Sequence, residues 1–237
     1  MVAVRDVKYE ADGATMSGRL ALPDVGGPWP GVLVAHEANG LDEFQRDKPS
    51  KLAEAGFAAF ALDYHGGGRV YTDRDEMMAR IQSLGSDRAR IRATAKAGLD
   101  VLVAEPGVDS SRVAAIGYCF GSAVVMELAR SGADLKAVVG FHPGTADHRV
   151  EDNLNIKAKV LMCIGAADPI IPADHRATFQ QEMTEAGVDW TIILYGHVKH
   201  SFTHPNSAST GIPGLEYNQQ AATRSWQAML DLFAEVL

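Results

Sequence analysis

The sequence predicts an α/β fold built on a mostly parallel sheet, with helices on both faces and an antiparallel hairpin at the N-terminus. Short, continuous apolar runs such as 31–35 and 159–164 are typical of strands that are buried on both faces. Helical patterns, for example over 88–105, alternate with these runs along most of the chain. Strands that alternate with helices form parallel sheets through right-handed crossovers, which place helices on both faces.

Length and composition indicate one domain over residues 1–237. A chain of 237 residues with 46% hydrophobic side chains can bury a sizeable core, and no linker or internal repeat divides it. The formal net charge of −8 disfavours nucleic acid as a partner. No apolar stretch reaches the length of a membrane span, and the N-terminus lacks the apolar segment of a signal peptide. We therefore expect a cytoplasmic protein that binds neither nucleic acid nor membrane.

The N-terminal half predicts a hairpin followed by two buried strands. Residues 4–10 and 14–22 flank the turn Ala11-Asp12-Gly13, and the second run alternates like a strand at a sheet edge. Further strands are expected at 31–35 and 57–62, and helices at 42–55, 72–84 and 88–105. Three consecutive glycines, Gly66–Gly68, form either the hinge of a flap over a site or an ordinary surface turn.

The C-terminal half repeats the order of strand and helix. Strands are expected at 112–116, 136–141, 159–164 and 189–195, helices at 123–128 and 173–186, a loop at 196–213, and a final helix through Ala222, Trp226, Met229, Phe233 and Val236. An exposed final helix could support a dimer, so monomer and homodimer both stay open. Ligands of such folds bind beyond the carboxyl ends of the strands, which makes the polar residues that follow strands the candidates for a site.

The segment Gly117-Tyr118-Cys119-Phe120-Gly121 joins an apolar run directly to a helical pattern. This is the strand–turn–helix context of a nucleophile elbow, with Cys in the position of Ser. A sharp turn points the central side chain outward and requires small residues two positions before and after it, because the strand and helix backbones pass close together. The N-terminus of a helix would also favour a thiolate at Cys119. The alternative is a buried cysteine in a connection that happens to contain glycines.

Two more candidates, Asp168 and His200, each follow an expected strand and so lie at the same edge of the sheet. With Cys119 they can form a relay in which His200 accepts the thiol proton and later protonates the leaving group. Asp168 would fix the tautomer of the imidazole and stabilise its charged form. His197 and His204 flank His200, and spacing alone allows either of them to be the base.

The remaining histidines and the second cysteine point to structural roles. His36 is expected to shape a turn through hydrogen bonds, and His65 and His142 to be pocket or turn residues. None of the eight histidines shows the close pairing of a zinc motif, so we expect no metal and no cofactor. Cys163 lies in the middle of a strand and is expected to be a buried apolar residue.

Four segments resemble the dienelactone hydrolase family of α/β-hydrolases, and they occur in that family's order. They are Gly117-Tyr118-Cys119-Phe120-Gly121, His36-Glu37-Ala38-Asn39-Gly40, Gly165-Ala166-Ala167-Asp168-Pro169 and His200-Ser201-Phe202. The resemblance spans nearly the whole chain, from the second strand to the last helix. It implies an α/β-hydrolase fold in which Cys119 is the nucleophile, His200 the base and Asp168 the acid.

The resemblance also implies roles for residues around the nucleophile. The backbone N–H groups of Ala38 and Phe120 match the family's oxyanion hole, which holds the negative oxygen of a tetrahedral intermediate. Glu37 matches a carboxylate that contacts the nucleophile and helps to control its ionisation. A buried carboxylate needs a partner such as the thiol or an arginine. Tyr118, beside the nucleophile, either packs in the core or lines the pocket.

The chain departs from the family where its members hold a substrate carboxylate. The arginine expected four residues after the catalytic histidine is replaced by His204. The nearest candidate for a second arginine is Arg69, which follows the three glycines. Histidine is a poor substitute for the planar, bidentate guanidinium group. Lys199 could supply a positive charge or face solvent. The departure bears on the substrate and leaves the hydrolytic residues intact.

The resemblance therefore implies a Cys-dependent hydrolase of a small-molecule ester or lactone that acts through a thioester acyl-enzyme. A carboxymethylenebutenolidase-like activity is the best named activity within this class. A general small-molecule esterase or thioesterase is the alternative enzyme. The alternative outside the enzymes is a non-catalytic relative that binds a small hydrophobic or acidic ligand. Alkylation of Cys119 separates the two classes, because a catalytic thiol reacts at lower pH than an inert one.

Overall fold

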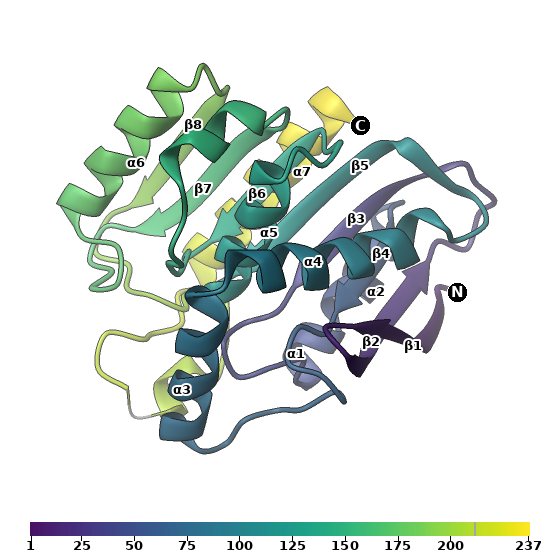
Figure 1. Ribbon diagram of the computed structural model, residues 1–237, viewed down its shortest axis with the longest axis horizontal. Coiled ribbons are helices and arrows are strands. Elements are labelled where there is room, and N and C mark those ends of the chain that lie inside the picture. Colours follow the sequence, from purple (N-terminus) through teal and green to yellow (C-terminus); the bar gives the residue numbers. More distant parts are fainter. Residues whose placement is uncertain (211) are drawn as a thin grey trace.

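The computed structural model describes residues 1–210 and 212–237, and its eight strands form one sheet (Figure 1). The strand order is β1-β2-β4-β3-β5-β6-β7-β8. The strands are β1 (Ala3–Ala11), β2 (Ala14–Leu22), β3 (Trp29–Ala35), β4 (Ala58–Leu62), β5 (Val108–Tyr118), β6 (Ala137–Phe141), β7 (Lys159–Gly165) and β8 (Trp190–Tyr195). Strands β3 to β8 are mutually parallel, whereas β2 runs antiparallel to both β1 and β4. The predicted parallel sheet with an N-terminal antiparallel hairpin is confirmed.

Helices cover both faces of this sheet, as the sequence predicts. In Figure 1, α4, α5 and α6 lie in front of the sheet, and α2 and α7 lie behind it. The helices are α1 (Glu43–Arg46), α2 (Lys48–Glu54), α3 (Arg74–Gly85), α4 (Arg88–Val103), α5 (Phe120–Arg130), α6 (Ala173–Glu185) and α7 (Gln219–Val236). Successive side chains of β3 alternate between two cores, with Leu33 in the front core and Val32 and Val34 in the rear core.

The predicted helix over 42–55 is wrong in one respect, because the structure divides it at Asp47 into α1 and α2. Asp42 caps α1 by accepting a hydrogen bond from the Gln45 backbone N–H. Pro49 lacks the N–H that would continue the hydrogen-bond ladder to Gln45, so one helix ends and the next begins with proline in its first turn. The divided helix carries Lys48 into the interior, where the side chain is only 6% exposed.

Two short 3-10 helices, η1 (Val150–Asn155) and η2 (Ser207–Thr210), add to the predicted elements. The second lies in the loop predicted over 196–213, which includes Gly211, outside the described residues. Within the described ranges, no helix has the length and apolarity needed to cross a membrane.

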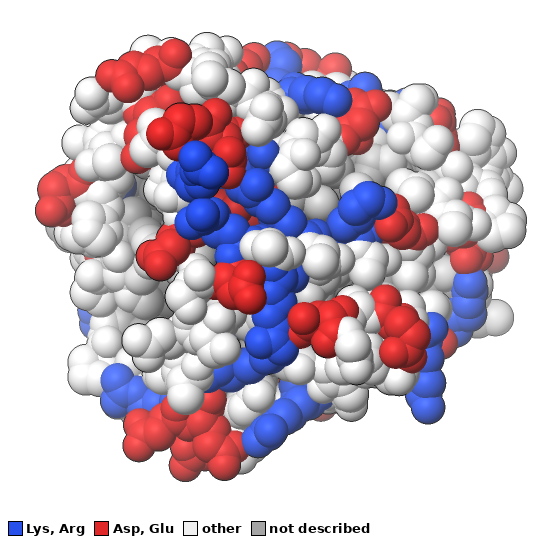
Figure 2. Space-filling view, in the orientation of Figure 1, with Lys and Arg blue, Asp and Glu red and all other residues white. Residues whose placement is uncertain are grey.

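Charged side chains on the front face are mostly paired. Figure 2 shows Lys and Arg gathered in a band near the middle of this face, bordered by Asp and Glu. Arg92 contacts Glu127 at 2.8 Å and Asp152 at 2.6 Å, and Arg130 contacts Glu127 at 3.1 Å. The fully buried Glu127 carboxylate is thus held between two arginines, an arrangement that compensates the cost of burying its charge.

Candidate active site

Cys119 occupies a strained turn between the last residue of β5 and the first residue of α5. Its φ of 50° and ψ of −122° lie outside the ordinary helical and extended regions. A Cβ atom on Gly117 would lie 2.2 Å from the Gly121 carbonyl oxygen. A Cβ atom on Gly121 would lie 2.4 Å from the carbonyl oxygens of Ala35 and His36. Both positions therefore admit only glycine without rearrangement, as expected from the spacing of the elbow.

Backbone hydrogen bonds hold this turn against two neighbouring segments. The Cys119 N–H donates to the carbonyl oxygen of Phe141, at the end of β6. The Cys119 carbonyl oxygen accepts hydrogen bonds from the N–H groups of Ser122, at 3.0 Å, and Gly144, at 2.7 Å. Because Phe120 begins α5, its N–H has no acceptor in a preceding helical turn and stays available to a ligand.

His200 and Asp168 meet across the loops that follow β8 and β7. The Nδ1 atom of His200 lies 2.7 Å from Oδ2 of Asp168, and both side chains are buried. The other Asp168 oxygen accepts a hydrogen bond from the Ile170 N–H at 2.8 Å, which fixes the orientation of the carboxylate. Nε2 of His200 makes no hydrogen bond within the described residues, so it is free to exchange a proton with a reacting group.

The electrostatic environment keeps His200 charged. Burial alone would lower the pKa of its imidazole, but the negative charge on the Cys119 sulfur and the hydrogen bond to Asp168 outweigh burial and raise the pKa to about 10. His200 is therefore an imidazolium at neutral pH when it faces the thiolate form of Cys119. A charged imidazole with its Nε2 beside a cysteine can act as a proton donor in this site.

Of the three histidines in this loop, His200 alone contacts Asp168 among the described residues. His197 lies exposed in the turn after β8, with a φ of 64°. Nε2 of His204 lies 3.3 Å from Asp42, and its ring lies 4.4 Å from the ring of Phe44. Burial would lower the pKa of His204, but the hydrogen bond to Asp42 and the charge of Glu37 raise it.

The segment that carries Ala38 is held in place by hydrogen bonds from residues that follow β4. The Tyr64 hydroxyl lies within hydrogen-bond distance of the carbonyl oxygens of His36, at 2.9 Å, and Glu37, at 2.8 Å. Nε2 of His65 lies 2.9 Å from the Ala38 carbonyl oxygen. These contacts orient the peptide units on both sides of the Ala38 N–H. Tyr64 has no motif around it that predicts this role, although its position just after a buried strand is a signal for a residue at the site.

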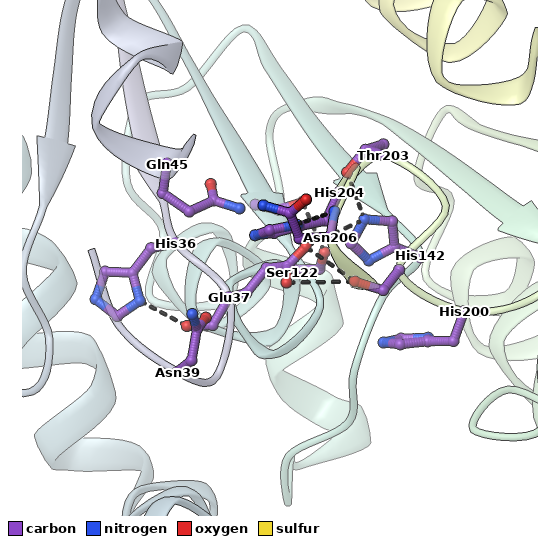
Figure 3. Close-up of polar contacts among 12 residues, drawn as sticks. His36, Glu37, Asn39, Gln45, Ser122, His142, His200, Thr203, His204 and Asn206 are labelled. Carbon is purple, nitrogen blue, oxygen red and sulfur yellow. Dashed lines mark hydrogen bonds and ion pairs between the residues drawn. The ribbon is translucent and has the colours of Figure 1, made fainter. Parts of the chain in front are cut away.

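Glu37 is buried beside the loop that carries His200 (Figure 3). Ser201 Oγ lies 3.3 Å from each of its carboxylate oxygens, and Nε2 of His142 lies 3.6 Å from Oε1. Burial raises the pKa of this carboxyl group, although nearby His204 and His200 act in the opposite direction. Within the described part of the chain, no hydrogen bond or ion pair joins this carboxylate to the Cys119 sulfur, so control of the nucleophile by Glu37 stays a prediction.

The candidate substrate-binding cations are engaged elsewhere. The Arg69 guanidinium lies 2.6 Å from Glu76 and stacks over the Tyr71 ring at 4.4 Å, at the exposed surface. Lys199 is likewise exposed and pairs with Glu216 at 2.6 Å.

Tyr118 is 1% exposed and stacks on Phe141, with ring centroids 4.8 Å apart, which places it in the rear core. Cys163 is completely buried, and burial raises the pKa of its thiol to about 12, in agreement with an inert residue.

The three glycines Gly66–Gly68 are anchored by Asp63, the first residue after β4. The Asp63 carboxylate accepts hydrogen bonds from the N–H groups of Gly66, at 2.9 Å, and Gly68, at 2.7 Å. It also accepts from the N–H groups of His65 and Ser17. Whether Gly66–Gly68 hinge a flap stays a prediction.

Nothing in the described part of the chain suggests a metal centre. No group of three or more His, Cys, Asp or Glu side chains among these residues has an arrangement that could hold a metal ion. The candidate site is therefore built from a thiol, an imidazole, two carboxylates and backbone N–H groups.

A mostly parallel sheet with an elbow after β5, an aspartate after β7 and a histidine after β8 defines an α/β-hydrolase. The sequence model of the dienelactone hydrolase family matches residues 16–237, and the chain belongs to this family. It is accordingly a hydrolase, and the predicted family and fold are confirmed.

Individual relatives agree with this assignment. The chain is 42% identical to the structure titled m3DLH, with a TM-score of 0.96 and coverage of 100% of this chain and 99% of that chain. It is also 42% identical to a dienelactone hydrolase-like promiscuous phosphotriesterase from metagenomic libraries, with a TM-score of 0.95 and coverage of 99% and 98%. A protein of Yersinia pestis with the provisional name carboxymethylenebutenolidase is 27% identical over 240 residues, which cover 95% of this chain and 85% of the relative.

Proposed function

We propose that this protein hydrolyses a small-molecule ester or lactone with Cys119 as nucleophile, His200 as acid and base, and Asp168 as the residue that orients His200. The observation that carries the proposal is the 2.7 Å contact between His200 and Asp168, buried beside a cysteine in a nucleophile elbow. Nucleophile, base and orienting carboxylate together make up the machinery of covalent acyl transfer.

In the acylation half of the reaction, the Cys119 thiolate attacks the carbonyl carbon and a C–S bond forms. The carbonyl oxygen becomes an oxyanion, which the N–H groups of Ala38 and Phe120 stabilise. As the tetrahedral intermediate collapses, the C–O bond to the leaving group breaks and the imidazolium of His200 donates its proton to the departing oxygen. The alcohol leaves, or the lactone ring opens, and a thioester on Cys119 remains.

In the deacylation half, the now neutral His200 accepts a proton from water, and the resulting hydroxide equivalent attacks the thioester carbonyl. The second tetrahedral intermediate uses the same two N–H groups. Its C–S bond breaks, the carboxylic acid leaves, and the thiolate and imidazolium are restored. Asp168 keeps Nδ1 of His200 hydrogen-bonded, so that Nε2 carries the proton that moves in both halves.

The surroundings of the site favour an uncharged substrate within this class. Arg69 is paired with Glu76 at the surface and His204 with Asp42, so neither supplies a free cation for a carboxylate. We therefore place simple esters and uncharged lactones ahead of the carboxylate-bearing dienelactone, although the carboxymethylenebutenolidase-like reaction uses the same residues. A cytoplasmic location and a monomeric or homodimeric state belong to the same proposal.

A second candidate activity is the hydrolysis of phosphotriesters. It is favoured by the 42% identity and near-complete overlap with a relative described as a promiscuous phosphotriesterase. In this reaction the Cys119 thiolate attacks phosphorus, the P–O bond to the leaving group breaks, and His200 protonates the departing oxygen. Water, deprotonated by His200, then attacks phosphorus and breaks the P–S bond, while the same N–H groups hold the phosphoryl oxygen.

Steady-state hydrolysis of a dienelactone, a nitrophenyl acetate and a nitrophenyl phosphotriester tests both candidates. Cys119→Ala should reduce every activity by more than about 10³-fold, because it removes the nucleophile. Cys163→Ala is the matched control and should retain activity. Full activity in Cys119→Ala would contradict the proposal. If the wild type turns over none of the three and Cys119 alkylates no faster than Cys163, the protein is instead a binding relative of this fold.

A further inference from the structure

A cavity of about 260 Å³ lies between α5 and α6, on the front face of the sheet. Carbon atoms make up most of its surface, and its apolar lining includes Ala123, Met126, Met162, Ile164, Ile171 and Phe179. Its volume is close to the lower end of the roughly 300–1,000 Å³ that is typical of small-molecule sites. A cavity of this size and lining suits an apolar chain of medium length.

The cavity shares a wall with the nucleophile elbow. Ser122 and Gly144 line it, and both donate backbone hydrogen bonds to the Cys119 carbonyl oxygen. A Cβ atom on Gly144 would lie 3.0 Å from the backbone nitrogen of Phe120. The part of the wall that Gly144 forms therefore adjoins the backbone N–H group of Phe120, to which the oxyanion is assigned.

The wall also contains titratable side chains, of which Arg130, His148 and Glu182 form ion pairs, whereas Arg176 bonds to a backbone carbonyl and His175 is exposed. Arg176 donates a hydrogen bond to the Ile171 carbonyl oxygen at 2.8 Å, and Arg130 pairs with Glu127 at 3.1 Å. His148 lies 2.8 Å from the Glu182 carboxylate, so these two side chains satisfy each other. The surface of the cavity is nevertheless mainly apolar, which favours uncharged acyl groups, because a charged group would lose much of its hydration there.

We propose that this cavity binds the apolar acyl chain of the substrate, so that the enzyme prefers esters of uncharged, medium-length carboxylic acids over acetates. This inference rests on the proposed function, because the acyl chain must be attached to Cys119 as a thioester when it occupies the cavity. Burial of each additional methylene should raise kcat/KM by about fourfold until the cavity is full.

Nitrophenyl acetate, butyrate, hexanoate and octanoate test the inference in the intact wild-type chain and in cavity variants. Thr178 lines the cavity from the exposed side of α6, so Thr178→Trp should fill it while leaving the core unchanged. We expect the ratio of kcat/KM for hexanoate to that for acetate to fall at least tenfold in this variant. Gln181→Trp is the matched control, because Gln181 is exposed on the same helix and does not line the cavity; its ratio should equal that of the wild type.

Phe179→Ala provides a second, independent variant, because it enlarges the cavity and should move the preferred chain toward octanoate. A wild-type kcat/KM that does not rise with chain length, or a ratio unchanged by both Thr178→Trp and Phe179→Ala, would overturn the inference. Such an outcome, with Cys119→Ala inactive, would leave the proposed function standing. Retained activity in Cys119→Ala would instead overturn the proposed function, so the two failures are distinguishable.

Discussion

The hydroxyl group of Tyr64 lies 2.8 Å from the carbonyl oxygen of Glu37 and so joins the end of β4 to the loop that follows β3. The Tyr64 ring also stacks on His36, with ring centroids 3.7 Å apart. The Glu37–Ala38 peptide, which contains the Ala38 N–H, is thereby held through its carbonyl oxygen and through the preceding His36 before any substrate arrives. A prearranged N–H group stabilises developing charge without the cost of reorganisation.

Tyr64→Phe should therefore reduce kcat by about tenfold and change KM little, because the loop that carries the Ala38 N–H loses its anchor. Steady-state kinetics with a nitrophenyl ester measure the effect. The rate of Cys119 alkylation by iodoacetamide should stay near the wild-type rate, since the nucleophile itself is untouched. Tyr195→Phe, a buried tyrosine on β8, is the matched control. Equal kcat values in the two variants would contradict this role for Tyr64.

The raised pKa of His200 predicts that the stability of the protein depends on pH. Because the folded-state pKa of about 10 exceeds the ordinary histidine pKa of 6.5, His200 contributes stability that is fully present below pH 6.5 and is lost as pH rises through about 10. In Cys119→Ala the charge on the sulfur is absent, so the pKa of His200 should fall below its wild-type value. NMR titration of the ring protons measures the shift, with the resonance assigned through His200→Gln. An unchanged pKa would show that the Cys119 charge does not act on the ring.

The buried Lys48 should give the free energy of unfolding a second pH dependence, opposite in sign to that of His200. Its ammonium lies over the rings of Phe44, at 3.7 Å, and Tyr118, at 5.1 Å, and has no ion pair within the described residues. Burial, and then the charge of Lys51, lowers its pKa from 10.5 to about 8. The unfolded chain binds more protons between these two values, so this lysine makes stability rise between pH 8 and 10.5, by up to about 3 kcal/mol.

Urea unfolding of wild type and Lys48→Met at pH 7.5 and 10 tests this prediction. The rise in the free energy of unfolding between these pH values should be smaller in Lys48→Met than in the wild type. Lys96→Met is the control, because Lys96 is exposed and pairs with Asp100. An identical rise in Lys48→Met and the wild type would mean that Lys48 keeps an ordinary pKa in the folded protein.

The buried pair of Glu127 and Arg130 should dominate the ionic contributions to stability. Glu127→Ala leaves Arg130, which is only 6% exposed, without its carboxylate, and should lower the free energy of unfolding by about 3–5 kcal/mol. Asp100→Ala breaks the exposed pair with Lys96 and should cost less than about 1 kcal/mol. Urea denaturation of both variants measures the difference, and equal losses would contradict it.

Patterns of short range were sufficient to predict most of the fold. The alternation in β2, the apolar runs of β3 and β7, and the spacing of Gly117 and Gly121 around Cys119 each follow from backbone geometry within a few residues. The same patterns indicate which edge of the sheet carries the site, because Cys119 and Asp168 each follow the carboxyl end of a strand. The break at Asp47 was missed although Pro49 supplies a local signal for it.

Contacts between segments that are distant in the sequence determine the arrangement of side chains in the candidate site and the position of the cavity. Sequence spacing allowed His197, His200 or His204 as the base, and packing of the loops after β7 and β8 brings His200 to Asp168. The partners of Arg69 and His204 and the cavity between α5 and α6 are likewise absent from any local pattern. Side chains far apart in the chain meet only after the sheet has formed, because their separation depends on how whole elements pack and not on their own neighbours.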